Sequence, residues 1–354
     1  MNPVNVLIVD DSALVRQVLL RGLISDPEIR VVGTAGDAIK AQKLIREKHP
    51  DVLTLDIEMP RMNGLQFLKQ LMRQTPLPVI MVSALTERGS KITLEALANG
   101  AVDFILKPSQ NIRQSLSAMM EELRAKIKVA AKANMRFLAR QRVLSARKAV
   151  LTMGNRQALA KRVIAIGAST GGTEAIHALL SALPANIPGT LVVQHIPAGF
   201  SEQFARRLDR DTALKVKEAR SGDYLLPGTV LIAPGNYHLQ LIRYNGSYRV
   251  ICRQGARVNG YRPSVDVLFR SVAKYAAGNA IGVLLTGMGY DGAEAMVALR
   301  KSGAYTLAQD ETTSVVFGMP KEAYLRGGVS RMLPLNEIPN AILRHLKEDI
   351  ALRN

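Results

Sequence analysis

The pattern that most constrains the fold is an alternation of short aliphatic runs with segments whose apolar residues recur every three or four positions. Strands that alternate with helices in this way predict a parallel sheet covered on both faces. The alternation occurs twice, in residues 1–110 and again from Lys161 onward. A chain of 354 residues therefore predicts two α/β domains. The runs expected to be strands are Val4–Val9, Val31–Val32, Val52–Leu55, Val79–Val82, Val102–Leu106, Val163–Ile166, Leu191–Gln194, Val230–Ala233 and Ile281–Leu285.

Between these blocks, residues 111–160 predict an amphipathic helix followed by a basic linker. This segment holds 11 Lys/Arg and 2 Asp/Glu, which is half of the net charge of +18. Binding to nucleic acid, attraction to an acidic protein or membrane surface, and a simple solvated linker all remain open explanations. Within the third segment, 161–354, residues 237–253 predict a strand pair with its turn at Asn245–Gly246.

The cellular compartment is indicated by what the sequence lacks. The first residues, MNPVNVLIVDD, have no basic region ahead of an apolar stretch, so we expect no signal peptide. No apolar run approaches the ~18 residues of a membrane span. The single cysteine, Cys252, is typical of a reducing compartment. We therefore expect a cytoplasmic protein.

The first group of candidate functional residues follows the strands of the first block. Asp10 and Asp11 end one run, and Asp56, Ser83 and Lys107 end three others. Because parallel strands end at the same edge of a sheet, these side chains are expected to share one crevice. Three carboxylates there predict a site for Mg²⁺, and Asp56 predicts a phosphoryl acceptor stabilised by the Lys107 ammonium and the Ser83 hydroxyl.

The second group follows strands of the second block. The segment 167–172 reads G-x-S-x-G-G between a strand and a helix, and it presents Ser169 on a sharp turn. His195 and Asp291 follow two further strands, so the three residues have the placement of a nucleophile, a base and an orienting carboxylate. Taken singly, Ser169 and Asp291 could be helix caps and His195 a structural histidine. Backbone N–H groups near Thr170 or Met288 are the expected oxyanion donors.

Two other function classes fit parts of the sequence. The glycines at 167–172 suggest a dinucleotide loop, but the G-x-G-x-x-G spacing and the acidic residue after the next strand are missing. The basic charge suggests a DNA-binding output domain, but about 190 residues of alternating strands and helices are too many for a helix-turn-helix module.

Residues 1–110 resemble the receiver domain of two-component response regulators. The motifs are Asp10–Asp11, the stretch LDIEMP around Asp56, Ser83–Ala84 and Lys107–Pro108. The resemblance implies a flavodoxin-like fold and phosphorylation of Asp56 by a histidine kinase. It implies Mg²⁺ held by Asp11, Asp56 and the backbone carbonyl of Glu58, with Asp10 behind them, and it makes Ser83, Phe104 and Lys107 the residues that respond to phosphorylation.

Residues 161–354 are similar to the chemotaxis protein-glutamate methylesterases, which carry such a receiver domain. The motifs, which occur in the same order, are GASTGG at 167–172, QHIPAGF at 194–200, APGN at 233–236 and LTGMGYDG at 285–292. One departure lies in the receiver block, where the turn has Asn63 and many members have Asp.

The resemblance implies a doubly wound, mostly parallel α/β domain with a β-hairpin. It implies hydrolysis of glutamate γ-methyl esters, and deamidation of glutamines, on methyl-accepting chemotaxis receptors by Ser169, His195 and Asp291. No cofactor is expected for ester hydrolysis. It implies that the unphosphorylated receiver partly covers the active site. Expected partners are the receptors and the chemotaxis histidine kinase, with no nucleic acid, at the periphery of receptor arrays; we expect a monomer.

Overall fold

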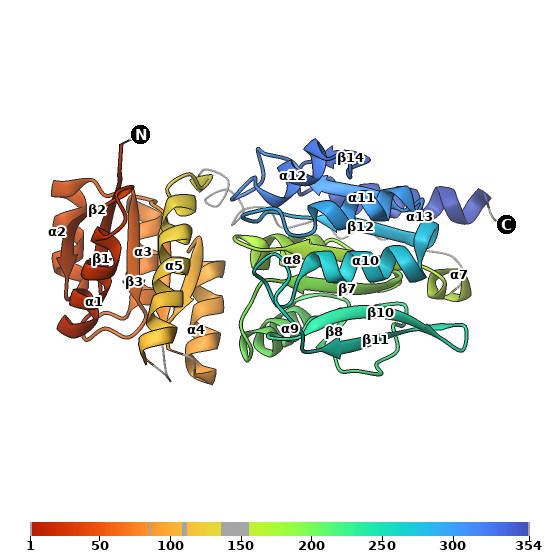
Figure 1. The fold of residues 1–354 in the computed structure, drawn as a ribbon, viewed down its shortest axis with the longest axis horizontal. Coiled ribbons are helices and arrows are strands. Elements are labelled where there is room, and N and C mark those ends of the chain that lie inside the picture. Colours follow the sequence, from red (N-terminus) through yellow and green to blue (C-terminus); the bar gives the residue numbers. More distant parts are fainter. Residues whose placement is uncertain (1, 85, 108–111, 136–155, 353–354) are drawn as a thin grey trace. The chain divides into compact units, whose positions relative to one another are not determined.

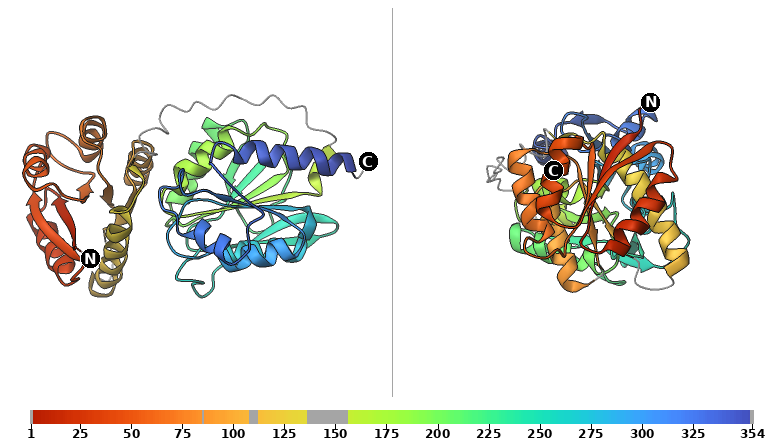
Figure 2. Two further views of the ribbon diagram at one scale, coloured as in Figure 1. Left: turned by 90° about the horizontal axis from the view of Figure 1, so that it is seen from above. Right: turned by 90° about the vertical axis from the view of Figure 1, so that its left-hand side faces the viewer.

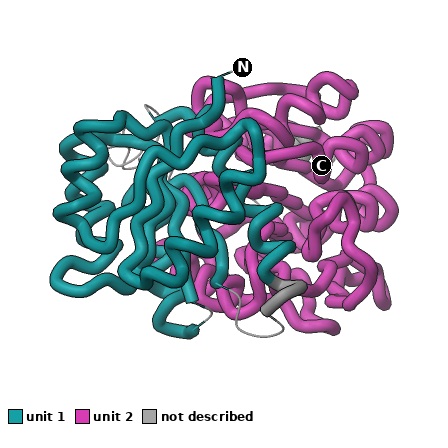
Figure 3. Tube along the Cα trace, turned by 60° about the vertical axis from the view of Figure 1, so that its left-hand side comes forward, with its two compact units in different colours: residues 1–142 teal, residues 143–354 magenta. Residues whose placement is uncertain are grey.

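The computed structural model describes residues 2–84, 86–107, 112–135 and 156–352. The chain divides into two compact units, Met1–Arg142 and Val143–Asn354 (Figure 3). Residues 136–155 of the predicted basic linker lie outside the described residues. Each unit is an α/β domain built on its own parallel sheet, as the alternating pattern predicts (Figure 1).

The first unit has five parallel strands in the order β2-β1-β3-β4-β5. The central strands are mostly aliphatic and buried, namely Val6–Val9 of β1 and all of β3 and β4, as expected for a sheet covered on both faces, whereas the edge strand β2 is only partly buried. Helix α1 packs against α5, and α3 packs against α4. The elements are β1 Val4–Val9, α1 Ala13–Ile24, β2 Ile29–Ala35, α2 Ala38–Lys48, β3 Val52–Asp56, α3 Gly64–Gln74, β4 Val79–Ser83, α4 Glu87–Ala98, β5 Asp103–Leu106 and α5 Ile112–Ala130.

Helix α5 belongs to this first unit, which therefore extends beyond the boundary at residue 110 expected from the sequence. Its apolar stripe, including Leu123 and Ile127, is completely buried, and the helix contacts β5, β4 and α1. The Arg124 guanidinium also donates to the Gly22 carbonyl at 2.9 and 2.6 Å. The amphipathic helix was predicted correctly, but its buried face packs against the receiver-like sheet and is not part of a linker.

The second unit has seven parallel strands in the order β14-β13-β12-β6-β7-β9-β8, with a separate two-stranded ribbon of β10 and β11. Its strands are β6 Val163–Ala168, β7 Gly189–Gln194, β8 Lys215–Glu218, β9 Thr229–Ile232, β10 His238–Tyr244, β11 Ser247–Arg253, β12 Ala280–Leu284, β13 Tyr305–Gln309 and β14 Arg331–Leu333. The ribbon turns at Asn245–Gly246 as predicted, and both turn residues have positive φ, 47° and 77°.

Helices cover both faces of the second sheet (Figure 2). The ribbon packs with α10, α11 and α12 around one hydrophobic core, while α13 packs against α8 on the other face. The helices are α7 Arg156–Ala160, α8 Gly172–Ser181, α9 Phe200–Asp211, α10 Val265–Tyr275, α11 Ala293–Lys301, α12 Met319–Leu325 and α13 Ile338–Leu352, with a short 3-10 turn at Ala277–Asn279. No helix in the described part of the chain is long and apolar enough to cross a membrane.

The topology of the second sheet brings the carboxyl ends of three strands to one edge. From β6 the chain adds β7, then the edge strand β8, and then β9 between these two, and it later returns to add β12 on the other side of β6. This change of direction is a topological switch point, where open α/β sheets bind their ligands beyond the carboxyl ends of the strands. Ser169, His195 and Asp291 all follow the carboxyl ends of β6, β7 and β12.

Candidate functional site

The turn between β6 and α8 holds Ser169 with its backbone fixed on both sides. The Ser169 N–H donates to the Thr286 carbonyl at 3.0 Å, and the Ser169 carbonyl accepts from Gly172 N–H at 2.7 Å. The next residue but one, Gly171, has φ of 76°, a conformation that glycine adopts without strain. A Cβ added at Gly172 would lie 2.2 Å from the Gln194 amide oxygen and 2.6 Å from the Ala168 Cβ, so a larger residue would force these neighbours to shift. The sequence therefore forms the tight strand-to-helix turn that its small residues predict.

Three side chains from the three strand ends form one hydrogen-bonded chain. The Ser169 Oγ lies 3.1 Å from His195 Nδ1, and His195 Nε2 lies 2.8 Å from Asp291 Oδ2. The carboxylate partner places the ring proton on Nε2, so the Nδ1 lone pair faces the serine hydroxyl. Ser169 is 8% exposed, the His195 side chain 6%, and Asp291 0%. The structure thus brings together the three residues that the sequence singled out, and it assigns the two ring nitrogens.

Asp291 is held as an anion although it is completely buried. Burial by itself raises the pKa of this carboxyl, but hydrogen bonds from His195, Asn259 and Ser264 outweigh burial and hold the pKa below its usual value. The Ser264 hydroxyl and the Val265 N–H donate at 2.8 and 2.7 Å. A buried carboxylate with this many donors can stabilise an imidazolium ion beside it without taking the proton itself.

A tight turn at 258–261 provides two contacts to the triad that sequence reasoning missed. The Asn259 side-chain amide donates to Asp291 Oδ1 at 2.9 Å and to Asp266 Oδ2 at 2.7 Å. The Tyr261 ring stacks on the His195 ring, with centroids 3.7 Å apart and planes 10° apart. Asn259 has φ of 53° and Gly260 of 85°, so an Asn-Gly turn positions both side chains. The dipeptide Asn259–Gly260 was the signal available in the sequence.

The two expected oxyanion donors follow the carboxyl ends of β6 and β12. Thr170 follows Ser169 and is 7% exposed, and its carbonyl accepts from the Thr286 hydroxyl at 3.0 Å. Met288 lies in the loop after β12, where the Gly287 N–H is already committed to Val316 at 3.1 Å. Among the described residues, none accepts a hydrogen bond from the Met288 N–H. Within residues 287 and 288, Met288 is thus the one with a backbone donor available for a substrate.

The strand ends of the first unit converge on Asp56. Lys107 Nζ lies 3.0 Å from Asp56 Oδ1 and 2.9 Å from Asp10 Oδ2, so one ammonium bridges two buried carboxylates. Burial raises the pKa of Asp56 to about 6, an effect that Lys107 opposes and the Asp10 carboxylate increases. Burial lowers the pKa of Lys107, but Asp56 and Asp10 more than offset this and leave its pKa raised. The site holds more negative charge than one lysine neutralises.

These residues fit a hard divalent cation. Carboxylate oxygens of Asp10, Asp11 and Asp56 lie within 4.8 Å of one another, and Asp11 is exposed to solvent. Oxygen donors in this number suit Mg²⁺, which also keeps several waters. Glu58 contributes through its backbone, where its N–H hydrogen-bonds the Asp56 carboxylate; its side chain is exposed.

The other two residues expected to respond to phosphorylation, Ser83 and Phe104, are both buried. The Ser83 hydroxyl donates to the Ala84 carbonyl at 3.2 Å and accepts from the Thr93 hydroxyl at 2.9 Å. Phe104 is 5% exposed, and Lys126 Nζ lies 5.4 Å from its ring centroid. In this conformation Ser83 is engaged with its own strand end and α4, so contact with a group on Asp56 requires its hydroxyl to turn.

Comparison with known proteins gives a family match for each unit. Residues 164–342 match the CheB methylesterase family, and residues 6–121 match the response regulator receiver domain. A protein-glutamate methylesterase/protein-glutamine glutaminase of Syntrophotalea carbinolica is 53% identical over 98% of both chains. One from Pseudomonas aeruginosa, numbered 2 in that organism, is 50% identical over 97% of both chains.

Among solved structures, the Thermotoga maritima CheB methylesterase catalytic domain is 38% identical. It covers 52% of this chain and 97% of its own, with a TM-score of 0.51. The dinucleotide-binding and DNA-binding alternatives do not agree with these matches. The chain therefore belongs to the CheB methylesterase family, hydrolases that here carry a receiver domain ahead of the methylesterase domain.

Proposed function

We propose that this protein hydrolyses glutamate γ-methyl esters on methyl-accepting chemotaxis receptors, deamidates receptor glutamines, and is activated by phosphorylation of Asp56. The single observation that carries the proposal is the hydrogen-bonded chain from Ser169 through His195 to Asp291 at 3.1 and 2.8 Å. Both reactions begin with attack on a γ-acyl carbon, so one nucleophile serves for both.

In the proposed mechanism, His195 Nδ1 takes the Ser169 proton as Oγ attacks the γ-carbon of the ester. Asp291 keeps its negative charge at Nε2 and stabilises the imidazolium. The Met288 N–H, together with the backbone at Thr170, donates to the oxyanion. The C–O bond to the methoxy group then breaks, and Nδ1 returns the proton so that methanol leaves.

Water completes the reaction by the same route in reverse. Nδ1 takes a proton from water as the water oxygen attacks the acyl-serine, and it returns the proton to Ser169 Oγ as the glutamate carboxylate is released. With glutamine, ammonia leaves in place of methanol. Tyr261, stacked on the His195 ring, limits ring rotation between these steps.

Asp56 is the proposed phosphoryl acceptor, with a chemotaxis histidine kinase as the donor. Mg²⁺, when bound by Asp11, Asp56 and the backbone at Glu58, supplies positive charge for the phosphoryl oxygens. Lys107 is already within ion-pair distance of Asp56 and remains to pair with the phosphoryl group, while Ser83 turns its hydroxyl toward it. Phe104, which is buried on β5 three residues before Lys107, would shift with this rearrangement and transmit it to the outer surface of the receiver.

The test is methanol release from receptor membranes carrying labelled methyl groups. Wild type, Ser169→Ala and Asp56→Asn are compared, each with and without a small phosphodonor and Mg²⁺. We expect Ser169→Ala to lose roughly a million-fold in kcat, and only wild type and not Asp56→Asn to respond to the phosphodonor. Methanol release by Ser169→Ala at the wild-type rate would refute the triad.

A further inference from the structure

One face of the methylesterase unit carries a strong local excess of positive charge. From His238 to Tyr275, through the ribbon, the following loop and α10, the sequence has seven Lys/Arg and one acidic residue, Asp266. Asp266 is 2% exposed and accepts hydrogen bonds from Asn259 and from the Ala295 N–H. By contrast, α8, α9 and α13 on the opposite face together have five Lys/Arg and six Asp/Glu. The excess therefore belongs to one face and does not reflect the charge of the whole unit.

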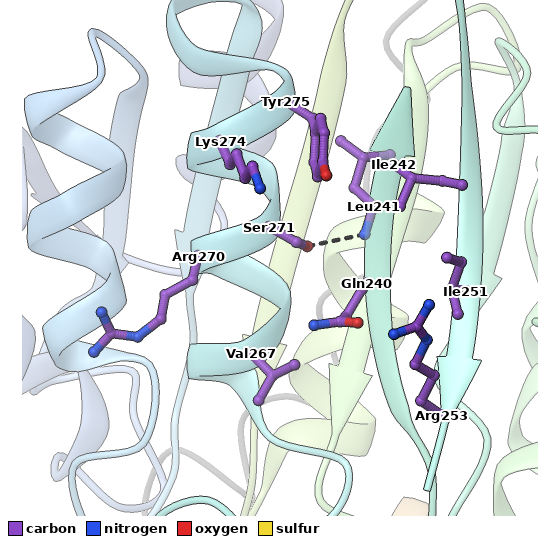
Figure 4. A pocket seen from close by; sticks show the side chains of 10 residues that line it. All are labelled: Gln240, Leu241, Ile242, Ile251, Arg253, Val267, Arg270, Ser271, Lys274 and Tyr275. Carbon is purple, nitrogen blue, oxygen red and sulfur yellow. Dashed lines mark hydrogen bonds between the residues drawn. The ribbon is translucent and has the colours of Figure 1, made fainter. Parts of the chain in front are cut away.

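A groove of about 370 Å³ runs along this face between α10 and the ribbon (Figure 4). At the bottom of the groove, a hydrogen bond joins the ribbon to α10: the Leu241 N–H donates to the Ser271 hydroxyl at 2.9 Å. Ile242, Ile251 and Val267 line it with partly exposed apolar surface.

The groove has an exposed cation on each wall, Arg253 on the ribbon and Lys274 on α10. Neither forms an ion pair with any described residue; Lys274 lies over the Tyr275 ring at 5.1 Å. The third lining cation, Arg270, extends toward α11, where it pairs with Glu294 at 2.9 Å in an exposed contact (Figure 4). Two positive charges with apolar surface between them are thus free to meet a negatively charged partner.

The groove begins next to the triad. Arg253 lies opposite His238 in the ribbon, and His238 Nδ1 accepts from the Ser264 N–H at 3.3 Å. The Ser264 hydroxyl in turn donates to Asp291. From there α10 leads to Lys274 over ten residues, about 15 Å at ~1.5 Å per residue. A polypeptide that places one side chain at Ser169 could therefore continue along the groove for about ten helical residues.

We propose that this groove docks the carboxylate-bearing segment of the polypeptide substrate next to the scissile γ-acyl group. The proposal rests on the proposed function, and the argument is charge complementarity. Every ester hydrolysed, and every glutamine deamidated, leaves a glutamate carboxylate, so a substrate with several such sites becomes negative beside the one still to be processed. Arg253 and Lys274 attract those carboxylates, and the apolar strip between them receives the aliphatic side chains of the same segment.

The experiment uses the full chain and two helical peptides, each with one glutamate γ-methyl ester. One peptide has glutamates at the flanking positions, and the other has alanines there. The double variant Arg253→Glu/Lys274→Glu is compared with the matched control Arg344→Glu/Lys347→Glu, which reverses two exposed charges on α13. Binding is measured by fluorescence anisotropy in the Ser169→Ala background, and methanol release is measured with Ser169 intact, for both peptides and a small neutral γ-methyl ester.

We expect the groove variant to bind the glutamate-flanked peptide at least tenfold more weakly, with a matching rise in KM and unchanged kcat. With the alanine-flanked peptide and the small ester, the groove variant should behave like wild type. The α13 control should stay within twofold of wild type in affinity, KM and kcat for every substrate. Raising salt to 0.5 M should remove most of the wild-type preference for the glutamate-flanked peptide.

Equal affinity of wild type and groove variant for the glutamate-flanked peptide overturns the docking proposal, as does an equal loss in the α13 control. Groove-dependent binding to phosphatidylglycerol vesicles without peptide binding would overturn it in favour of a lipid surface. The proposed function fails separately, if wild type releases no methanol from the peptides or the small ester.

Discussion

The contact that most directly supports the triad is the Asn259 amide, whose two N–H groups are shared between two buried carboxylates. One donates to Asp291 at 2.9 Å and the other to Asp266 at 2.7 Å. Asn259→Asp keeps the size of the side chain but replaces the NH₂ group with an oxygen. The change removes both hydrogen bonds and places a third carboxylate between the first two.

The cost follows from these contacts. A hydrogen bond to a charged group contributes about 1.5–3 kcal/mol, so the loss of two removes at least ~3 kcal/mol of unfolding free energy. For a unit of this size, 1 kcal/mol corresponds to about 2–4 °C in Tm, so the methylesterase transition should fall by about 6–12 °C.

The loss should also depend on pH. Three adjacent carboxylates raise the pKa of at least one of them in the folded state, so the folded variant holds a proton that the unfolded chain releases. The variant is therefore least destabilised near pH 5, and stability is lost as the pH rises through the raised pKa.

The assay is thermal unfolding followed by circular dichroism between pH 5 and 8, with methanol release measured on the same samples. Asn245→Asp is the matched control, because Asn245 also begins an Asn-Gly turn, with φ of 47° against 53° for Asn259. It has an exposed side chain at the tip of the ribbon. If both variants melt within 1 °C of each other at pH 8, the bridging amide has no such role.

Three further changes test the two sites. Tyr261→Leu should lower kcat about fivefold, because stacking of Tyr261 on the imidazolium of His195 contributes ~1 kcal/mol. Tyr261→Phe keeps the ring and should have a kcat within twofold of wild type. A fivefold loss in both variants would show that the hydroxyl matters and not the stacking. Asp56→Asn should raise the Tm of the receiver at pH 8 in EDTA. The pKa of Asp56 is raised to about 6 in the folded protein, so ionisation of Asp56 destabilises the fold as the pH rises above the pKa that this carboxyl has in the unfolded chain. A lower Tm of Asp56→Asn would contradict this. Gly287→Ala should abolish methanol release without changing receiver phosphorylation, because its Cβ would lie 2.8 Å from the Ser169 Cβ; wild-type turnover would show that the loop can give way.

Most of the strands that the sequence predicted contain aliphatic runs that are buried in the structure, such as β3, β4, β6, β7 and β12. Three strands of the second sheet were not predicted: β13, which is an inner strand of five residues, and the two edge strands β8 and β14. β8 reads KVKE, with both lysines exposed, and β14 is three residues long, so neither has an aliphatic run. Helix α9 was also missed although its buried Phe200, Phe204 and Leu208 recur every four residues. That signal was present in the sequence and was overlooked.

The site was predictable to the extent that it follows from strand ends. Two of its residues, Ser169 and His195, come directly after the ends of β6 and β7, and Asp291 comes after the loop that follows β12. Parallel topology alone therefore brings all three to one edge of the sheet. Asn259 reaches Asp291 from a loop turn 32 residues away, and no periodic pattern indicates which way a turn presents its side chains. The nitrogen that faces Ser169 likewise depends on ring rotation, which only the three-dimensional contacts determine.

The β10–β11 ribbon has a consequence for how such enzymes can diverge. It forms a sheet of its own, inserted between β9 and α10, and its register is set by its own cross-strand pairs. Its tip at Asn245–Gly246 is exposed, and a side chain added at Gly246 would meet no atom within 4 Å. Residues can therefore be inserted or exchanged at the tip without shifting any pair of the seven-stranded sheet, which makes the ribbon a natural place for lineages, or for protein engineers, to change the surface beside a constant triad.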